Sequence, residues 1–210
     1  MKDRLNVPPT RSSLLDLKRR LGFLREGYRL LERKRELLTR LVYEKLAEYQ
    51  KLERSTREVM ITAYRWLSIT QLRMGSRRIR QLAVGMPEAI EARVLARRNM
   101  SVQYPAVEIR PLPLLPVGIL ATDASLDETR AGFTEMLVRA ARLAEVETAL
   151  WRLLEEQRKT QKRVNALKYN VIPRYERTIH YVESSLEEEE RNSLFQLKLL
   201  AERNAADNPA

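Results

Sequence analysis

The sequence of 210 residues contains no cysteine, a single histidine and only six glycines. The missing cysteine excludes disulfides, thiolate metal sites and a cysteine nucleophile. With one histidine, His180, imidazole metal clusters and most histidine-based catalytic arrangements are excluded. The glycines allow neither a Walker phosphate loop nor a dinucleotide-binding fingerprint. We therefore predict a protein that is not an enzyme by itself and that has no catalytic residue, cofactor or metal site.

Long hydrophobic runs are also missing. No stretch of about 18 consecutive apolar residues is present, and the N-terminal segment lacks the apolar core of a signal peptide. Aromatic residues make up 6% of the chain and charged residues 32%, a composition that suits long helices better than a β-rich fold. We expect a soluble, cytoplasmic protein that does not insert into a membrane.

The charge is unevenly distributed. The formal net charge is +11, and residues 1–60 carry 16 basic and 9 acidic side chains, whereas residues 131–210 carry 13 of each. This asymmetry indicates a polyanionic or acidic partner surface, and nucleic acid, anionic lipid and an acidic protein bore are all compatible with it. An ordinary solvated helix face is the plainer interpretation. The compact basic clusters are Lys18-Arg19-Arg20, Arg33-Lys34-Arg35 and Arg77-Arg78-Ile79-Arg80.

A heptad pattern predicts a first long helix over residues 11–74. Alternating steps of three and four residues meet an apolar side chain at thirteen of seventeen positions, which is typical of a left-handed supercoil. At about 1.5 Å per residue, such a helix needs a partner along roughly 90 Å. The seventeen positions are Leu14, Leu17, Leu21, Leu24, Tyr28, Leu31, Arg35, Leu38, Val42, Lys45, Tyr49, Leu52, Thr56, Val59, Ala63, Trp66 and Thr70.

A second long helix is predicted over residues 126–203. Ser125 and Glu128 have the spacing of a capping box at its start. We expect Pro173 to bend this helix without ending it, and we expect residues 204–210 to fray. The predicted seam is more polar than the first: Phe133, Met136, Ala140, Leu143, Glu147, Leu150, Leu154, Gln157, Gln161, Val164, Lys168, Val171, Tyr175, Thr178 and Val182.

The two helices should pair antiparallel within one elongated domain, residue i lying opposite about 200 minus i. Residues 75–124, rich in proline and glycine, then form a middle lobe. There the alternation from Ile90 to Ala96 predicts a half-buried strand, and Val107–Ile109 offers its partner; a helix over 87–98 is the alternative. The expected fold is mainly α: a long antiparallel two-helix coiled coil with a small β-hairpin lobe at its turn end.

Several motifs resemble those of one protein family. They are Pro9-Thr10-Arg11 with Leu14-Leu15, the stretch from Leu30 to Leu37, the stretch from Pro116 to Asp127, and Lys162-Arg163-Val164-Asn165-Ala166-Leu167 followed by Ile172-Pro173-Arg174. In order and spacing they resemble the D subunit of the V-type and A-type rotary ATPases over nearly the whole chain. The stretch from Arg163 to Pro173 is the most specific, because heptad spacing requires neither Asn165 nor Pro173.

The resemblance implies a central rotor shaft that couples ATP hydrolysis or synthesis to ion translocation. Its implied partners are the ring of catalytic and regulatory subunits, the small F subunit and a funnel-shaped subunit that links it to the membrane rotor, and nucleic acid is not among them. We hypothesise a basic ridge made of Arg33, Lys34, Arg35, Lys162 and Arg163. The candidate contact residues are these five with Pro9, Thr10, Arg11, Val164, Asn165, Ala166, Leu167 and Pro173. A free-standing basic coiled-coil scaffold or nucleic-acid-binding protein is the alternative.

Overall fold

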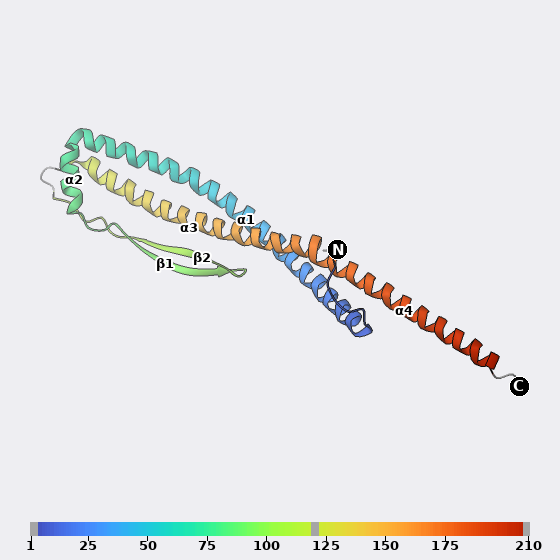
Figure 1. The fold of residues 1–210 in the computed structure, drawn as a ribbon. Coiled ribbons are helices and arrows are strands. Elements are labelled where there is room, and N and C mark those ends of the chain that lie inside the picture. Colours follow the sequence, from blue (N-terminus) through green and yellow to red (C-terminus); the bar gives the residue numbers. More distant parts are fainter. Residues whose placement is uncertain (1–3, 119–121, 208–210) are drawn as a thin grey trace. The chain divides into compact units, whose positions relative to one another are not determined.

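Long helices make up most of the chain (Figure 1). The structure is a computed structural model that describes residues 4–118 and 122–207. The mainly α fold with one small antiparallel sheet, predicted from the sequence, is confirmed. The elements are α1 (Arg11–Met74), α2 (Ser76–Val84), β1 (Ile90–Asn99), β2 (Val102–Pro111), α3 (Ala124–Ala166), the π-helical segment η1 (Leu167–Val171) and α4 (Ile172–Asp207).

The heptad seam of α1 faces the interior along the whole helix. All seventeen predicted positions are buried or half-buried, including the polar ones. The chain divides into two units, one of residues 1–36 with 158–210 and one of residues 37–157. In the first unit Leu17 and Leu21 form a core with Ile179 and Val182 of α4. In each unit α1 therefore pairs antiparallel with the second helical stretch, as the sequence predicts.

The predicted seam of the second helix is wrong at three positions. Ala140, Glu147 and Lys168 are exposed. In the second unit the β-hairpin covers part of the α3 face that packs on α1, because Val102 of β2 packs with Leu38 of α1 and Leu153 of α3. This additional cover widens the buried face beyond a two-helix seam, so that it takes in Val146, Ala149 and Leu153.

The hairpin forms where the sequence predicts strands, and the alternative helix over 87–98 is wrong. Its turn is made by Met100 and Ser101, which both have positive φ, at 47° and 69°, as a two-residue hairpin turn requires. The hairpin is not confined to the turn end: it lies back alongside α3 (Figure 1), and Val102, next to its turn, packs on Leu38. The strands are also longer than predicted, at ten residues each.

The strand face that the sequence predicts to be half-buried is half-buried only at Ile90 on β1. Ala92, Val94 and Ala96 of β1 are exposed, whereas the buried residues of the sheet are Val102 and Ala106 of β2. In an antiparallel pair these two groups lie on opposite faces. On the face that the alternation indicates, Ile90, Val107 and Ile109 are half-buried, but Ala92, Val94 and Ala96 are not covered by the described part of this chain.

Three further boundaries differ from the sequence analysis. The short helix α2 lies in a region where no helix was expected, and Gly75, at φ 80°, separates it from α1. The second helix begins at Ala124 instead of 126. α4 continues to Asp207, into the tail that was expected to fray; residues 208–210 of that tail lie outside the described residues.

The helix continues through Pro173, as predicted. The break in its hydrogen bonding is absorbed by η1, where the Ile172 N–H donates to the Leu167 carbonyl, five residues earlier. Proline lacks an N–H and crowds the carbonyl four residues before it, here that of Tyr169. A single π turn directly before the proline loosens the helix at that carbonyl, which lets α4 proceed.

Candidate partner interface

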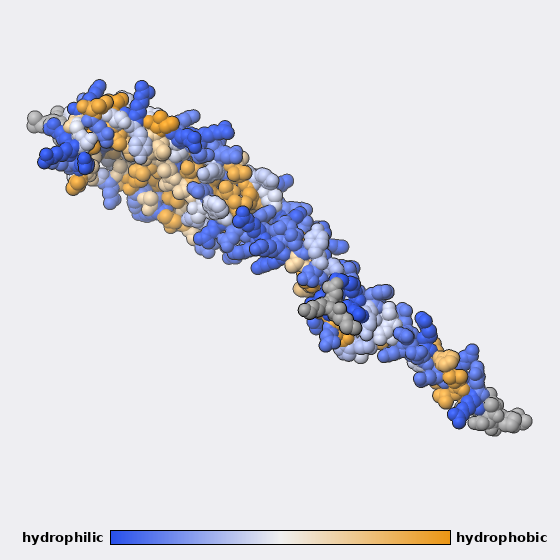
Figure 2. All heavy atoms as spheres, turned by 45° about the horizontal axis from the view of Figure 1, so that its top comes forward, coloured by the Kyte–Doolittle hydropathy of each residue, from blue (hydrophilic) through white to orange (hydrophobic). Residues whose placement is uncertain are grey.

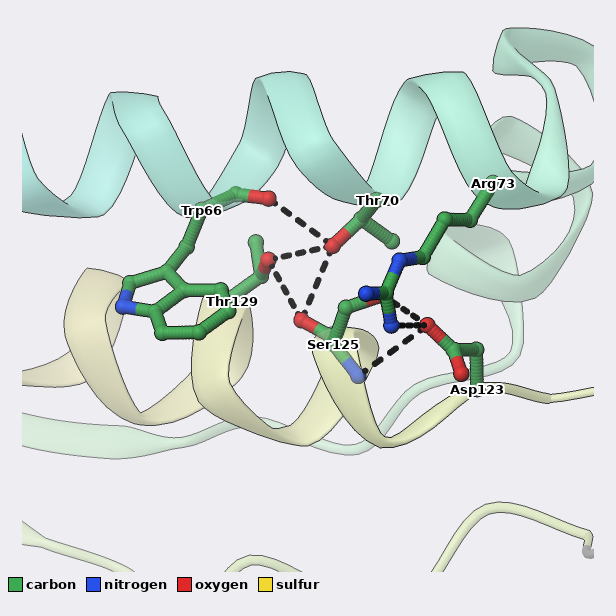
Figure 3. Close-up of polar contacts among 6 residues, drawn as sticks. All are labelled: Trp66, Thr70, Arg73, Asp123, Ser125 and Thr129. Carbon is green, nitrogen blue, oxygen red and sulfur yellow. Dashed lines mark hydrogen bonds and ion pairs between the residues drawn. The ribbon is translucent and has the colours of Figure 1, made fainter.

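A buried polar cluster joins α1 and α3 near the end of α1 (Figure 3). The hydroxyl of Thr70 lies 2.8 Å from the Ser125 carbonyl oxygen, 2.8 Å from the Thr129 hydroxyl and 2.9 Å from the Trp66 carbonyl oxygen. Thr129 also donates to the Ser125 carbonyl at 2.8 Å. Thr70, Ser125 and Thr129 are all buried. Because buried hydroxyls require partners, this cluster favours one register of the two helices over its neighbours.

Asp123 organises the start of α3 beside this cluster (Figure 3). Its carboxylate accepts hydrogen bonds from the N–H and the hydroxyl of Ser125 and pairs with Arg73 of α1 at 3.1 Å. The Ser125 hydroxyl and Arg73 both stabilise the charged form and so lower the pKa of Asp123. The predicted capping box of Ser125 and Glu128 is therefore wrong, because the acceptor at the helix start is Asp123 and Ser125 lies inside the helix.

The most specific motif forms a cross-helix network. Arg35 pairs with Glu32 at 2.6 Å and donates to the side-chain oxygen of Gln161 at 3.3 Å. Gln161 in turn donates to Asn165 at 2.8 Å. Asn165 is thus linked to α1 through Gln161, and Val164 beside it is buried, with 2% of its surface exposed. These residues hold the two helices of the first unit together.

The other basic members of the proposed ridge lie around this network. Arg33, Lys162 and Arg163 are exposed, whereas Lys34 is half-buried and makes contacts of its own. Arg33 and Lys34 directly precede Arg35, and Lys162 and Arg163 directly follow Gln161. Because Arg35 and Gln161 are hydrogen-bonded, the basic residues of both helices lie at about the same height along the pair. Further along the motif, Ala166 is exposed and directly precedes η1, whereas Leu167, the first residue of η1, and Pro173, beyond its end, are half-buried.

The N-terminal motif begins α1 and ties the helix to α4. Thr10 caps the helix: its hydroxyl accepts from the Ser13 N–H at 3.2 Å and its carbonyl from the Leu14 N–H at 2.9 Å. Arg11 pairs with Glu190 of α4, and Pro9 is half-buried. The residues before the cap fold back onto α4, where the Leu5 N–H donates to Thr178 at 3.0 Å.

This reversal leaves the end of α4 without a partner helix among the described residues. Beyond Glu190 the side chains are exposed as far as they are described, through Arg203. Several of them are large and apolar, and Figure 2 shows this apolar surface near the C-terminal end. Sequence reasoning missed it, although the signal was present: apolar residues continue past the last position that α1 can pair. They are Leu194, Phe195, Leu197, Leu199 and Leu200, each with 49% to 67% of its surface exposed.

The described residues contain no group of three or more histidine, aspartate or glutamate side chains that could hold a metal ion. Within those residues, no helix is long and apolar enough to cross a membrane. Their features are paired helices, interhelical polar clusters, basic groups and one uncovered apolar helix end. These define a helical-hairpin protein whose surfaces suit contact with other proteins.

Comparison with known proteins identifies the family. The family model for the D subunit of ATP synthase matches residues 13–202. The V-type ATP synthase D subunit of Thermotoga neapolitana is 37% identical over 202 residues, covering 96% of this chain and 100% of that protein. The A-type ATP synthase D subunits of Pyrococcus furiosus and Pyrococcus horikoshii are each 36% identical, with 94% of both chains covered. The chain belongs to the family of ATP synthase D subunits.

Proposed function

We propose that this chain is the central shaft of a V/A-type rotary ATPase, working in the cytoplasm at the membrane surface. The observation that carries the proposal is the unpartnered end of α4, where large apolar side chains from Leu194 to Leu200 are exposed. Burying a leucine side chain stabilises by about 1.5–3 kcal/mol, so a surrounding sleeve of protein would bind this end firmly. The ring of catalytic and regulatory subunits is the sleeve we propose.

Two paired helices suit the task of coupling. A helix pair is asymmetric about its axis, so at each angle it presents a different face to each surrounding subunit. Differential contact of this kind can shift each of these subunits toward a different conformation. We propose that the small F subunit binds the side of the helix pair and that a funnel-shaped subunit holds its turn end, where α2 carries exposed Arg77, Arg78 and Arg80.

The α4 end provides the decisive test. Leu197→Gln with Leu200→Gln should reduce ATP-driven ion uptake by the reconstituted complex by about tenfold or more, because apolar burial in the sleeve is lost. Lys198→Gln with Glu202→Gln is the matched control on the same turns. Both double variants should unfold like the unchanged chain in isolation, since all four side chains are exposed there. Undiminished ion uptake by the leucine variant would remove the main support for a shaft.

The basic ridge is a second part of the proposal. We propose that Arg33, Lys162 and Arg163 face an acidic rim in the ring, with Arg35 and Lys34 supporting them. Reversing the three exposed charges to glutamate should weaken the coupling of ATP hydrolysis to ion uptake, more so at low salt. Lys51→Glu with Arg65→Glu, exposed basic positions elsewhere on α1, should have little effect. If the two variants couple ATP hydrolysis to ion uptake equally well, the three ridge residues have no special role in coupling.

A further inference from the structure

The two outer edges of the hairpin differ in their capacity to pair. In an antiparallel pair, backbone groups point alternately toward the partner strand and outward. On β2 the Val107 N–H points outward, since it donates to the Glu145 side chain of α3 at 3.2 Å. The outward positions two and four residues away include Pro105 and Pro111, which have no N–H to offer. The β2 edge is thus closed to a further strand.

The β1 edge has none of this protection. Val94 pairs with Val107, so Val94 and every second residue of β1 also point their N–H and C=O groups outward. None of them is a proline. Within the described part of the chain, no group accepts a hydrogen bond from these outward N–H groups. The outward residues are Ile90, Ala92, Val94, Ala96 and Arg98.

Three of these outward residues, Ala92, Val94 and Ala96, also form an apolar surface on one face of the sheet. Val94 is 69% exposed, and Ala92 and Ala96 beside it on that face are exposed too. Val107 and Ile109 of β2 lie on the same face. A sheet face with this alternation is normally covered, yet the helices of this chain contact the opposite face, through Val102 and Ala106. An open edge and exposed apolar side chains therefore coincide on β1, although Val107 and Ile109 on the same face are half-buried.

The charge of β1 indicates what would cover it. Arg93 is paired with Glu91 at 2.8 Å, but within the described residues no carboxylate lies in ion-pair distance of Arg97 or Arg98. Arg152 of α3 borders the groove of about 350 Å³ beside Val94 and Leu95. Arginine without a partner at the end of an apolar strand favours an acidic occupant.

We propose that β1 accepts an extended segment of a neighbouring subunit as a third strand, with apolar side chains over Val94 and carboxylates near Arg97 and Arg98. Main-chain hydrogen bonds to the outward groups of β1 provide affinity, and the alternating side chains provide specificity. The inference rests on the proposed function in one respect: the segment belongs to another protein of the rotary complex. It adds a backbone interaction at the hairpin, separate from the α4 end and the basic ridge.

Hydrogen exchange measures this interaction directly. The exchange of the β1 amides is compared in the isolated full-length chain and in the complete purified complex. In the isolated chain the Ala92, Val94 and Ala96 amides should exchange freely. In the complex they should exchange about 100-fold more slowly, as hydrogen-bonded amides of a stable sheet do. The Val107 amide, already bonded to Glu145, serves as the internal reference.

One substitution isolates the backbone. Ala96 lies opposite Pro105 at an outward position, so Ala96→Pro removes an outward N–H and leaves the bonds between β1 and β2 intact. In the complex this variant should lose most of the protection at Val94, by about tenfold or more. Ala96→Val keeps the N–H and should retain the protection. If the proline variant misfolds, the comparison of the unchanged chain with its complex still decides the matter.

Four results would overturn the proposal. The first is that the β1 amides exchange equally fast in the complex and in the isolated chain. The proposed shaft function would still stand in that case if ion uptake depends on the α4 leucines. The second is full protection in a folded Ala96→Pro complex. The third is protection that rises with the concentration of the isolated chain, since a second copy would then occupy the edge. The fourth is a chain that does not join the complex, which would also refute the shaft.

Discussion

Thr70 of α1 and Ser125 of α3 meet through a single hydroxyl: the Thr70 oxygen lies 2.8 Å from the Ser125 carbonyl oxygen. Thr70 has no exposed surface, so water cannot replace this partner. The hydroxyl of Thr129 completes the contact at 2.8 Å. A shift of one helix along the other would leave these polar atoms against apolar side chains, at a cost of about 1–3 kcal/mol for each unsatisfied group.

Replacing Thr70 by valine should therefore lower the free energy of unfolding by about 1–2 kcal/mol. Valine keeps the shape of threonine and leaves the hydroxyl of Thr129 without one partner. Urea denaturation followed by circular dichroism measures the difference. Thr62→Val is the control: its exposed hydroxyl bonds only to the Glu58 carbonyl of the same helix, and its loss should cost less than about 0.5 kcal/mol. Equal effects of the two substitutions would deny the cluster any special role.

Asp123 should make part of the stability depend on pH. Its pKa is lowered in the folded chain by the Ser125 hydroxyl and Arg73, so its contribution is complete above the ordinary aspartate pKa of about 3.9. The contribution is lost as the pH falls through the lowered folded value. Asp123→Asn should consequently destabilise the chain at pH 7 and have progressively less effect below about pH 4.

Denaturation of Asp123→Asn and the unchanged chain over a series of pH values measures this difference. Glu58→Gln, an exposed carboxylate on α1, provides the comparison and should leave the pH profile nearly unchanged. A destabilisation by Asp123→Asn that stays constant down to the acid limit would mean that the amide disturbs the start of α3 for a reason other than charge.

The sequence predicts those parts of the fold that follow from a local repeat, and it fails where contacts between residues distant in the sequence decide the packing. The α1 seam, from Leu14 to Thr70, is correct at every position because its apolar heptad repeat marks the face that packs on the second helix. The α3 seam is wrong at Glu147, which is exposed, because the buried face of α3 there takes in Val146, Ala149 and Leu153 instead, and Leu153 packs against Val102 of the hairpin. Which face of a hairpin meets the helices depends on contacts distant in sequence, and alternation alone cannot distinguish the two faces.

The candidate interface shows the same limit. The family motif singles out Asn165, and the seam positions include Arg35 and Gln161, but the hydrogen bonds by which Gln161 links the other two are visible only once both helices are placed. Asp123 was missed as the cap because Ser125 has the expected residue type at a plausible spacing. The hydrogen bonds from Ser125 make Asp123 the acceptor at the helix start, and its pairing with Arg73, fifty residues away, adds a contact that no local pattern contains.

Leu38 should be the most sensitive apolar position of the second unit. It has no exposed surface and packs with Leu153 and Val102, so it joins α1, α3 and the hairpin. Leu38→Ala should cost about 2–5 kcal/mol and should speed amide exchange at the hairpin turn. The neighbouring Leu37, 44% exposed, gives the matched control, and Leu37→Ala should cost less than about 1 kcal/mol. A Leu38→Ala chain with an unchanged hairpin would show that the hairpin is held by other contacts.

Pro173 should be a position where stability can be gained. The π turn of η1 accommodates a residue that lacks an N–H, and proline inside a helix costs about 3 kcal/mol before such adjustment. Pro173→Ala restores the donor, so it should raise the free energy of unfolding by about 1 kcal/mol or more and convert η1 to α-helix. Thermal denaturation measures the first effect, and the carbonyl chemical shifts of residues 167–171 measure the second.

Pro113→Ala, in an exposed stretch, is the control and should change neither the stability nor these chemical shifts. If Pro173→Ala leaves the π turn in place, its cause lies in the packing of Leu167 and Val171 and not in the proline.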